Sequence, residues 1–301
     1  MKTEYFFVNV KLTKRLIEKL TARLTVKLTK RLTVKLTARL TIKLTKRLIE
    51  RMMMSEELDV LIRNADKKKA ALGIKVPLSP ELEAAYQERF LYASIYNSLA
   101  IEGNSLTEAE IERVLTMNEV IAGKSLTDHL SVVGYRDAML LARQYANAQT
   151  RIGEHEIRKL HYRLLIDQQD VSGEYRNYNL MVRRRRPTSY EKIAYKMHEL
   201  VESISALAEE QHSIEIAAFF HLRFEKIHPF GDGNGRVGRL IINMMLEKEG
   251  FPAVIFSYDE KGDYYAALEA YDGLAGNPDV EPMKLFLAKL VNRRLDELLA
   301  L

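Results

Sequence analysis

The chain has 301 residues, 47% of them hydrophobic, which is enough to bury the core of one sizeable domain or of two small ones. It has no cysteine, which excludes disulfides and thiol chemistry, and no uninterrupted apolar run of about 18 residues that would span a membrane. The net charge of +5 arises in residues 11–51, where fourteen Lys and Arg and two Glu give a charge of +12. The remaining residues therefore carry a net charge of −7, so the body of the chain is not a basic protein of the nucleic-acid-binding type.

The basic segment is a repeat of five eight-residue units between residues 11 and 50. The units read KLTKRLIE, KLTARLTV, KLTKRLTV, KLTARLTI and KLTKRLIE, with leucine at every fourth position from Leu12 to Leu48. This period also fits the alternation of a strand, but the segment has no Gly, Pro, Asn or Asp to turn one, and we expect a helix of about 60 Å. Such a cationic helix suits a membrane surface or nucleic acid, and a neutral expansion is the third alternative.

Helical patterns dominate the remaining sequence. Residues 52–79 form a mixed-charge connector, helical to about residue 71, and Ser79-Pro80-Glu81 is a good helix start. That helix closes at the segment SLAIEGN, residues 98–104, where Gly103 is a plausible cap. Another helix starts at residues 105–108. Further helices are expected over about 127–149, 154–168, 189–210, 215–227, 236–249, 261–272 and 281–299.

A segment of different character runs from Gly173 to Pro187. Its residues Leu180, Met181 and Val182 suit a short strand modestly by composition. Four consecutive arginines, residues 183–186, follow them. The run is either a solvated charge cluster or a site that favours an acidic partner segment.

The most informative segment is a glycine-rich loop between two predicted helices, HPFGDGNGRVGR at residues 228–239. Backbone N–H groups in such a loop and at the next helix start form an anion site, to which Arg236 and Arg239 add forked donors. Asp232 offers an oxygen ligand for Mg²⁺, and His228 is a candidate general base. The loop lacks the Gly-Lys-Ser/Thr ending of a P-loop, and Asn243 stands where a calcium loop needs Glu. These parts predict a site that holds a metal–nucleotide and deprotonates a hydroxyl.

This segment resembles the signature of the Fic family, HxFx(D/E)GNGRxxR, at every fixed position. The resemblance implies an all-α fold, namely a Fic-type helical bundle with a small β-hairpin flap, and transfer of AMP from ATP to a protein hydroxyl. It implies that His228 is the general base and that Asp232 holds Mg²⁺. The residues that would bind the nucleotide phosphates are Gly233, Asn234, Gly235, Arg236 and Arg239.

The segment at residues 98–104 is similar to the Fic inhibitory motif, (S/T)xxxE(G/N), with Ser98 and Glu102 at its fixed positions. Its place before the signature is typical of an inhibitory helix within the same chain. The resemblance implies that Glu102 pairs with Arg239 and prevents ATP from placing its terminal phosphate productively. A carboxylate on that arginine would neutralise a phosphate clamp.

Two weaker similarities complete the comparison. The segment after Gly173 is similar to the Fic flap, whose backbone aligns a target peptide as an added strand, although the arginine run replaces the usual glycine and histidine. The flap residues would be Leu180, Met181, Val182 and Arg183. Tyr264 matches an aromatic residue near the adenine in relatives, with a core tyrosine as the alternative. Asp272 falls where relatives often have Asn.

We therefore expect three regions: the repeat at 1–51, an N-terminal helical region with the inhibitory motif at 52–125, and the catalytic core with C-terminal helices at 126–301. The expected function is that of an autoinhibited protein adenylyltransferase acting on a Ser, Thr or Tyr hydroxyl of a target protein, with ATP as co-substrate and Mg²⁺ as cofactor. Removal of AMP by the same site is one alternative, and a surface-binding protein with a vestigial Fic body is another. A homodimer, and membrane or nucleic-acid contact through the repeat, stay open. The N-terminus lacks a signal-peptide core, and we expect a cytoplasmic protein.

Overall fold

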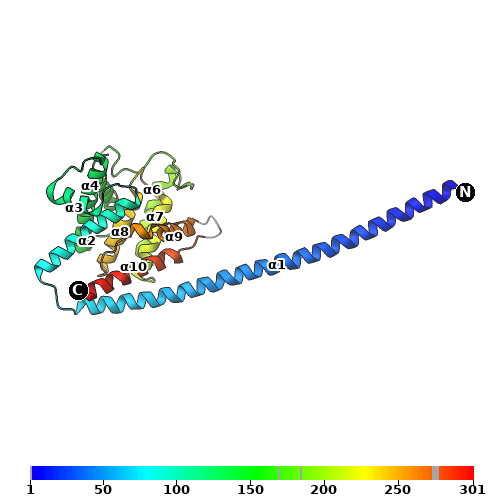
Figure 1. Cartoon of the computed structure of the whole chain (residues 1–301), viewed down its shortest axis with the longest axis horizontal. Helices are drawn as coiled ribbons and strands as arrows, with labels where there is room; N and C mark the ends of the chain where they lie inside the picture. The colour runs from blue at the N-terminus through cyan, green and yellow to red at the C-terminus, as the bar shows by residue number, and fades with distance from the viewer. Residues whose placement is uncertain (1, 169, 184, 273–277) are drawn as a thin grey trace. The chain divides into compact units, whose positions relative to one another are not determined.

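The structure is a computed structural model that describes the backbone of residues 2–168, 170–183, 185–272 and 278–301, with side chains except at 2–18 and at part of the positions between 22 and 48. Arg184 of the arginine run lies outside the described residues. The chain consists of two units, Met1–Met53 and Met54–Leu301. Figure 1 labels their elements in chain order.

The repeat is helical, as its sequence predicts. It forms most of the first unit, within helix α1 (Lys2–Gly73). Threonine hydroxyls donate to the carbonyl four residues earlier, from Thr25 to Thr21 and from Thr29 to Thr25, each over 2.8 Å. Thr33 and Thr37 continue the same pattern. The helix thus satisfies these hydroxyls within itself.

The second unit confirms the predicted all-α fold, and within its described residues there is no extended strand. Besides the last turns of α1 it contains α2 (Pro80–Ile101), α3 (Glu108–Met117), α4 (Leu126–Asn147), α5 (Glu154–Leu164), α6 (Ile193–Leu207), α7 (Ser213–Ile227), α8 (Asn234–Lys248), α9 (Lys261–Asp272), α10 (Glu281–Ala300) and the short 3₁₀ helices η1 (Tyr190–Lys192) and η2 (Tyr258–Glu260). In the part of the chain that is described, no helix combines the length and apolar character of a membrane span.

Local capping explains where several of these helices begin. Ser79 accepts a hydrogen bond from the N–H of Leu82, and Pro80 occupies the first helical position of α2. Thr107 and Glu110 form a reciprocal capping box at the start of α3. The helix expected at 236–249 begins two residues earlier, at Asn234, because a left-handed glycine precedes it.

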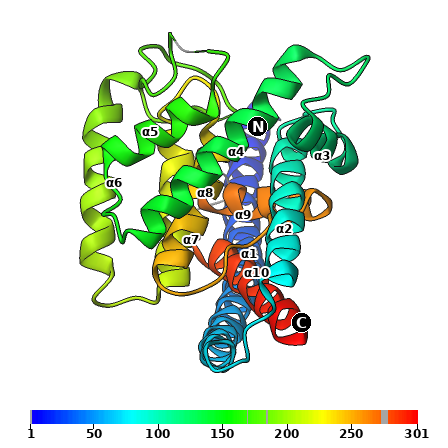
Figure 2. The same ribbon diagram turned by 90° about the vertical axis from the view of Figure 1, so that its left-hand side faces the viewer.

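Helices α7 and α8 lie at the centre of the bundle, between α6 and α2 (Figure 2). Helix α7 also packs on α10, and α8 packs on α4 and α2. Phe220 and Phe224 of α7 and Ile241 of α8 are fully buried between them. The C-terminal part of α1 joins this core through Leu58, which is 4% exposed. The loop that joins α7 to α8 is therefore held between two rigid, packed elements.

The described residues of the flap segment contain no extended hairpin strands. Val182 and Arg185 form an isolated antiparallel bridge, with N–H to carbonyl distances of 3.0 and 2.9 Å. The β-hairpin prediction is therefore not confirmed beyond this one bridge.

Candidate active site

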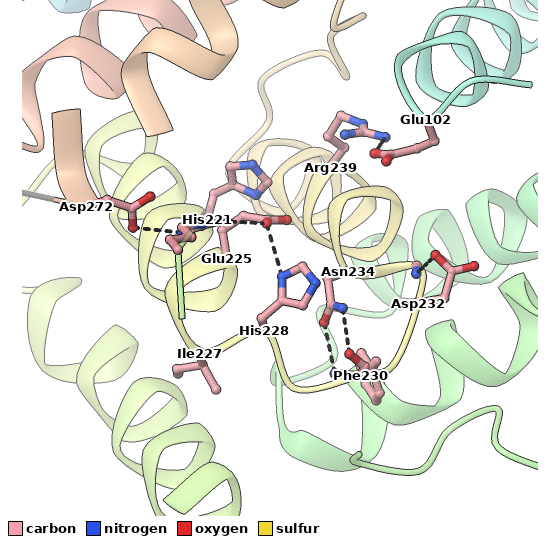
Figure 3. Close-up of polar contacts among 12 residues, drawn as sticks. Glu102, His221, Glu225, Ile227, His228, Phe230, Asp232, Asn234, Arg239 and Asp272 are labelled. Carbon is pink, nitrogen blue, oxygen red and sulfur yellow. Dashed lines mark hydrogen bonds and ion pairs between the residues drawn. The ribbon is translucent and has the colours of Figure 1, made fainter. Parts of the chain in front are cut away.

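His228 lies at the C-terminal end of α7 in a left-handed conformation. Its φ is 51° and its ψ is 63°, and its backbone N–H donates to the carbonyl of Phe224 over 2.8 Å. Positive φ is uncommon outside glycine and persists where the surroundings hold it. This conformation ends α7 and directs the imidazole toward Glu225, in the last turn of the same helix (Figure 3).

Glu225 belongs to a buried chain of charges that ends at His228. Its Oε2 lies 3.6 Å from Nδ1 of His228 and 3.7 Å from Nη2 of Arg185. Arg185 also donates from Nη1 to Oδ1 of Asp272 over 2.7 Å. Burial raises the pKa of Glu225, but His228, His221 and Arg185 outweigh burial and lower the pKa to about 2. Glu225 is thus an ionised carboxylate in the core beside the candidate base.

Two side chains fix the shape of the loop after His228. The Asn234 side chain accepts from the N–H of Phe230 over 3.0 Å and donates to its carbonyl over 2.9 Å. His161 stacks on the Phe230 ring, and its Nδ1 accepts from the N–H of Gly173 over 2.7 Å. Nε2 of His161 therefore carries the hydrogen and donates to the carbonyl of Asp232 over 3.0 Å. Burial lowers the pKa of His161 to about 4, which keeps the ring neutral in this role.

Arg176 ties the flap segment to the same loop. Its N–H donates to the carbonyl of Pro229 over 2.9 Å, and its Nε donates to the carbonyl of His228 over 2.8 Å. The guanidinium also donates to the carbonyls of Tyr178 and Thr188, which lie before and after the flap residues 180–183. A single buried side chain thus positions the flap relative to His228.

The start of α8 has the geometry that the N-terminus of a helix offers to an anion. Gly233, with φ at 76°, precedes the helix and gives it no side-chain cap. The first backbone N–H groups of α8, at Asn234, Gly235 and Arg236, have no partner within the helix. Asp232 accepts from the N–H of Gly233 over 2.6 Å and from Nη2 of Arg236 over 2.7 Å. Burial raises the pKa of Asp232, but the Arg236 charge and the Gly233 N–H bring it below its ordinary value.

The Glu102 carboxylate lies on Arg239 and next to Gly235, beside this helix start. Nη2 of Arg239 donates to Oε1 of Glu102 over 2.9 Å and to the carbonyl of Ser98 over 3.0 Å, and its Nε donates to Oγ of Ser98 over 2.9 Å. A Cβ added at Gly235 would lie only 2.5 Å from Oε1 of Glu102. Burial lowers the pKa of Arg239, but Glu102 outweighs burial and raises it. The structure thus brings Ser98 and Glu102 of the inhibitory motif onto Arg239 and against the first turn of α8 (Figure 3).

The prediction that the ring of Tyr264 lies near the adenine is wrong. Its side chain is 1% exposed, its hydroxyl lies 2.7 Å from Nε2 of the buried His221, and its ring packs edge-on against Phe256. Such a ring has no free face for a base, and the second alternative, a core tyrosine, is the correct one. The neighbouring Tyr265 is half-buried, and the guanidinium of the flap residue Arg183 lies over its ring.

The other flap residues lie near the surface. Met181 is 58% exposed, while Leu180 and Val182 are half-buried. Of these three apolar side chains, Met181 is thus the one that faces solvent.

Three residues of this site carry no motif in the sequence. Glu225 stands three positions before His228, a spacing that places two residues on one helix face, and this is the only signal that indicates it. Arg176 begins the flap-like segment, but nothing in that similarity indicates its contact with the loop after His228, and His161 contacts the same loop from a distant part of the sequence. No local pattern distinguishes His161 from other core histidines.

Comparisons with known proteins agree with this geometry. Residues 151–246 match the profile of the Fic/DOC family. A protein adenylyltransferase Fic of Nematostella vectensis is 30% identical over 257 residues, which are 83% of this chain and 57% of that protein. One of Drosophila willistoni is 31% identical over 241 residues, 78% of this chain and 47% of that protein. The chain thus spans about half the length of the curated relatives it matches.

Solved structures give the same result. A Fic domain containing signaling protein of Bacteroides thetaiotaomicron VPI-5482 superposes with a TM-score of 0.72 at 26% identity, covering 79% of this chain and 95% of that one. Fic-1 of C. elegans superposes with a TM-score of 0.72 at 25% identity, covering 82% and 73%. Residues 151–246 thus match the Fic/DOC family, and the chain shares the fold of these solved Fic proteins.

Proposed function

We propose that this chain is an autoinhibited protein adenylyltransferase, which transfers AMP from ATP to a Ser, Thr or Tyr hydroxyl of a target protein. The names of its curated relatives support the activity. A base at the end of α7 next to an anion site at the start of α8 supports the chemistry. Such a transfer at phosphorus depends mainly on positioning and on neutralisation of charge.

The proposed reaction assigns one task to each part of the site. The hydroxyl oxygen of the target attacks the α-phosphorus, and His228 takes the hydroxyl proton. A bond forms between that oxygen and the α-phosphorus, the bond to the oxygen bridging α- and β-phosphorus breaks, and pyrophosphate leaves. The N–H groups at the start of α8, together with Arg236 and Arg239, bind the phosphates.

Asp232 is the residue that would hold Mg²⁺, which neutralises phosphate charge when bound. Among the described residues no cluster of three or more His, Asp and Glu forms a metal site. A nucleotide-bound Mg²⁺ does not need one, because one or two carboxylates and the phosphates suffice. Asp232 fits, because its side chain is 57% exposed and each of its oxygens accepts one hydrogen bond and keeps a second lone pair.

The observation that carries the proposal is the position of Glu102. Its carboxylate bonds to the buried Arg239 and lies against Gly235, where the first turn of α8 would receive a phosphate. The site therefore has affinity for an anion, and an internal anion fills it. We infer that Glu102 must move before ATP can place its terminal phosphate on Arg239.

We propose further that the target binds along the flap. Leu180, Met181 and Val182 would pair with an extended target segment through their backbone, as an added strand. Arg183 and Arg186, both exposed, favour an acidic segment next to the modified hydroxyl.

The test uses ATP labelled on either its α- or its γ-phosphate, with Mg²⁺ and the Glu102→Gly variant. Label from the α-position on the enzyme or on an added protein, with none from the γ-position, is the expected result. The double variant Glu102→Gly, His228→Ala serves as the control for spontaneous labelling. Label from the γ-position would instead identify phosphoryl transfer. Loss of label from a modified protein on incubation with the parent, but not with Glu102→Gly, would identify AMP removal as the reaction that Glu102 serves.

A further inference from the structure

We propose that Glu225 is a positioning residue for His228. Its buried carboxylate accepts a hydrogen bond from Nδ1–H of the imidazole and leaves Nε2 free to take the proton of the attacking hydroxyl. The inference rests on the proposed function and adds to it the residue that prepares the base.

The local geometry supports this pairing. The positive φ of His228 and its N–H bond to Phe224 fix the backbone so that the ring lies over the last turn of α7. Oε2 of Glu225 is 3.6 Å from Nδ1, about 0.8 Å longer than a charge-assisted hydrogen bond. Bonds of catalytic pairs are often long before the substrate binds.

Unsatisfied atoms point to the same pairing. Within the described chain, Nδ1 of His228 and Oε1 of Glu225 are buried and have no hydrogen-bond partner. Burying a polar atom without a partner is unfavourable, so Nδ1 of His228 would be stabilised by closing on Oε2, the oxygen that already faces it. The side chains are 13% and 7% exposed, which leaves little room for water to serve instead.

The charged side chains linked to Glu225 do not balance one another. Glu225 and Asp272 are carboxylates, and Arg185 between them is a single guanidinium, so the cluster carries one surplus negative charge. Glu225 stays ionised, because its pKa is lowered to about 2. A proton that arrives on His228 neutralises the cluster, and that is the charge change the transfer reaction needs.

The other groups that face Glu225 do not alter this balance. His221, one turn earlier on α7, is neutral because burial lowers its pKa to about 4, and its Nε2 pairs with the hydroxyl of Tyr264. Arg239 of α8 acts on His221 from the other side, but Glu102 pairs with its charge. His228 is thus the group through which Glu225 can gain a compensating proton.

The arrangement also assigns a role to the flap arginines. Arg185 comes from the run that replaces the usual flap residues, and Asp272 stands where relatives often have Asn. Asp272 pairs with Arg185, and Nη2 of Arg185 lies 3.7 Å from Oε2 of Glu225, the same oxygen that faces His228. The departure of this chain from the family pattern therefore lies next to its base.

The first experiment measures the tautomer directly and needs no ATP. The chain is labelled with ¹⁵N-histidine, and the His228 ring signals are assigned by their loss in His228→Ala. We expect the neutral ring of His228 to carry its hydrogen on Nδ1, and Glu225→Gln to shift it to a mixture of tautomers. Hydrogen on Nε2 as the main form in the parent would overturn the proposal, whatever the enzyme does with ATP.

The second experiment measures transfer in the Glu102→Gly background. Glu225→Gln keeps the side-chain size and removes the charge, and we expect kcat to fall about ten- to hundredfold, the worth of one charge-assisted hydrogen bond. KM for ATP and the rise in Tm on adding ATP should not change, because the phosphates bind on α8. Glu202→Gln, which breaks an exposed ion pair with Arg151, is the matched control and should keep the full rate.

Outcomes of these experiments separate the two proposals. An unchanged kcat in Glu225→Gln overturns the positioning role. A fall in kcat with an equal loss of ATP affinity and of Tm indicates a structural role only, and overturns it as well. If no variant transfers AMP at all, the proposed function fails, and the tautomer measurement still decides the role of Glu225.

Discussion

Replacing Glu102 by glycine should raise the rate of AMP transfer, because it frees Arg239 for the terminal phosphate of ATP. In the parent the two side chains meet at 2.9 Å, with Arg239 1% exposed and Glu102 39% exposed. A hydrogen bond between charged groups contributes about 1.5–3 kcal/mol, and partial exposure of Glu102 to water favours the lower part of this range. About 1.5–2 kcal/mol corresponds to a ten- to thirtyfold gain in competent binding.

The assay follows the rate of labelling from α-labelled ATP at saturating ATP and Mg²⁺. Glu102→Gln, which keeps the size of the side chain, should show a smaller gain in the same direction. The gain should disappear when Arg239→Ala is added. The rise in Tm on adding ATP should also be larger in Glu102→Gly than in the parent, because phosphate then replaces the lost carboxylate.

Equal labelling in parent and Glu102→Gly would refute the reasoning, since it would mean that the Glu102–Arg239 pair does not oppose ATP. A gain that survives in the Arg239→Ala double variant would also refute it. In that case Glu102 would act by another route, such as blocking Gly235 alone.

Three further predictions follow from the same structure. His228→Ala should abolish AMP transfer while ATP still raises Tm, because the N–H groups of α8 are untouched; transfer at the parent rate would contradict the assignment of the base. Deleting residues 11–50 should leave ATP binding and AMP transfer unchanged, because the family resemblance begins after them. Loss of ATP binding or of transfer would contradict this prediction. If the deletion abolished only binding to anionic vesicles, that result would support a surface role for the repeat. The free energy of unfolding should fall between about pH 7 and pH 5, because the pKa values of His161 and His221 are lowered from 6.5 to about 4. Below pH 6.5 these histidines are protonated in the unfolded chain but stay neutral in the folded chain, and this difference favours unfolding. Urea unfolding should show that the free energy of unfolding falls by about 2 kcal/mol per histidine over this range. Glu225, with its pKa at about 2, affects stability only at lower pH. A free energy of unfolding that does not change between pH 7 and pH 5 would contradict the burial of both rings.

Local sequence predicts the elements and the signature loop well, because their physics is local. Ser79 and Thr107 are N-cap residues and so indicate where helices begin. The loop from His228 to Arg239 contains its hydrogen-bond donors within one short segment. The structure places Glu102 on Arg239 as the resemblance implies. These are the cases in which a few neighbouring residues, or a known motif, determine the geometry.

The parts that sequence does not predict depend on contacts between distant segments. Tyr264 looks the same in sequence whether its ring faces a base or the core, and only the packing of α9 on α7 decides that it is buried. His161 supports the loop through the carbonyl of Asp232, 71 positions away. Arg185 looks like one of four equivalent arginines, and only the fold brings it between Asp272 and Glu225.

The helical repeat has a consequence for how this chain can vary. Each unit is eight codons long, so gain or loss of a unit preserves the reading frame. In an α-helix, eight residues add about 12 Å and turn one end by about 80° relative to the other. The threonine bonds recur along the repeat, and a new unit therefore arrives with its own internal hydrogen bonds. Alleles that differ by whole units would have helices of different lengths, and each added unit would form the same internal hydrogen bonds as the others.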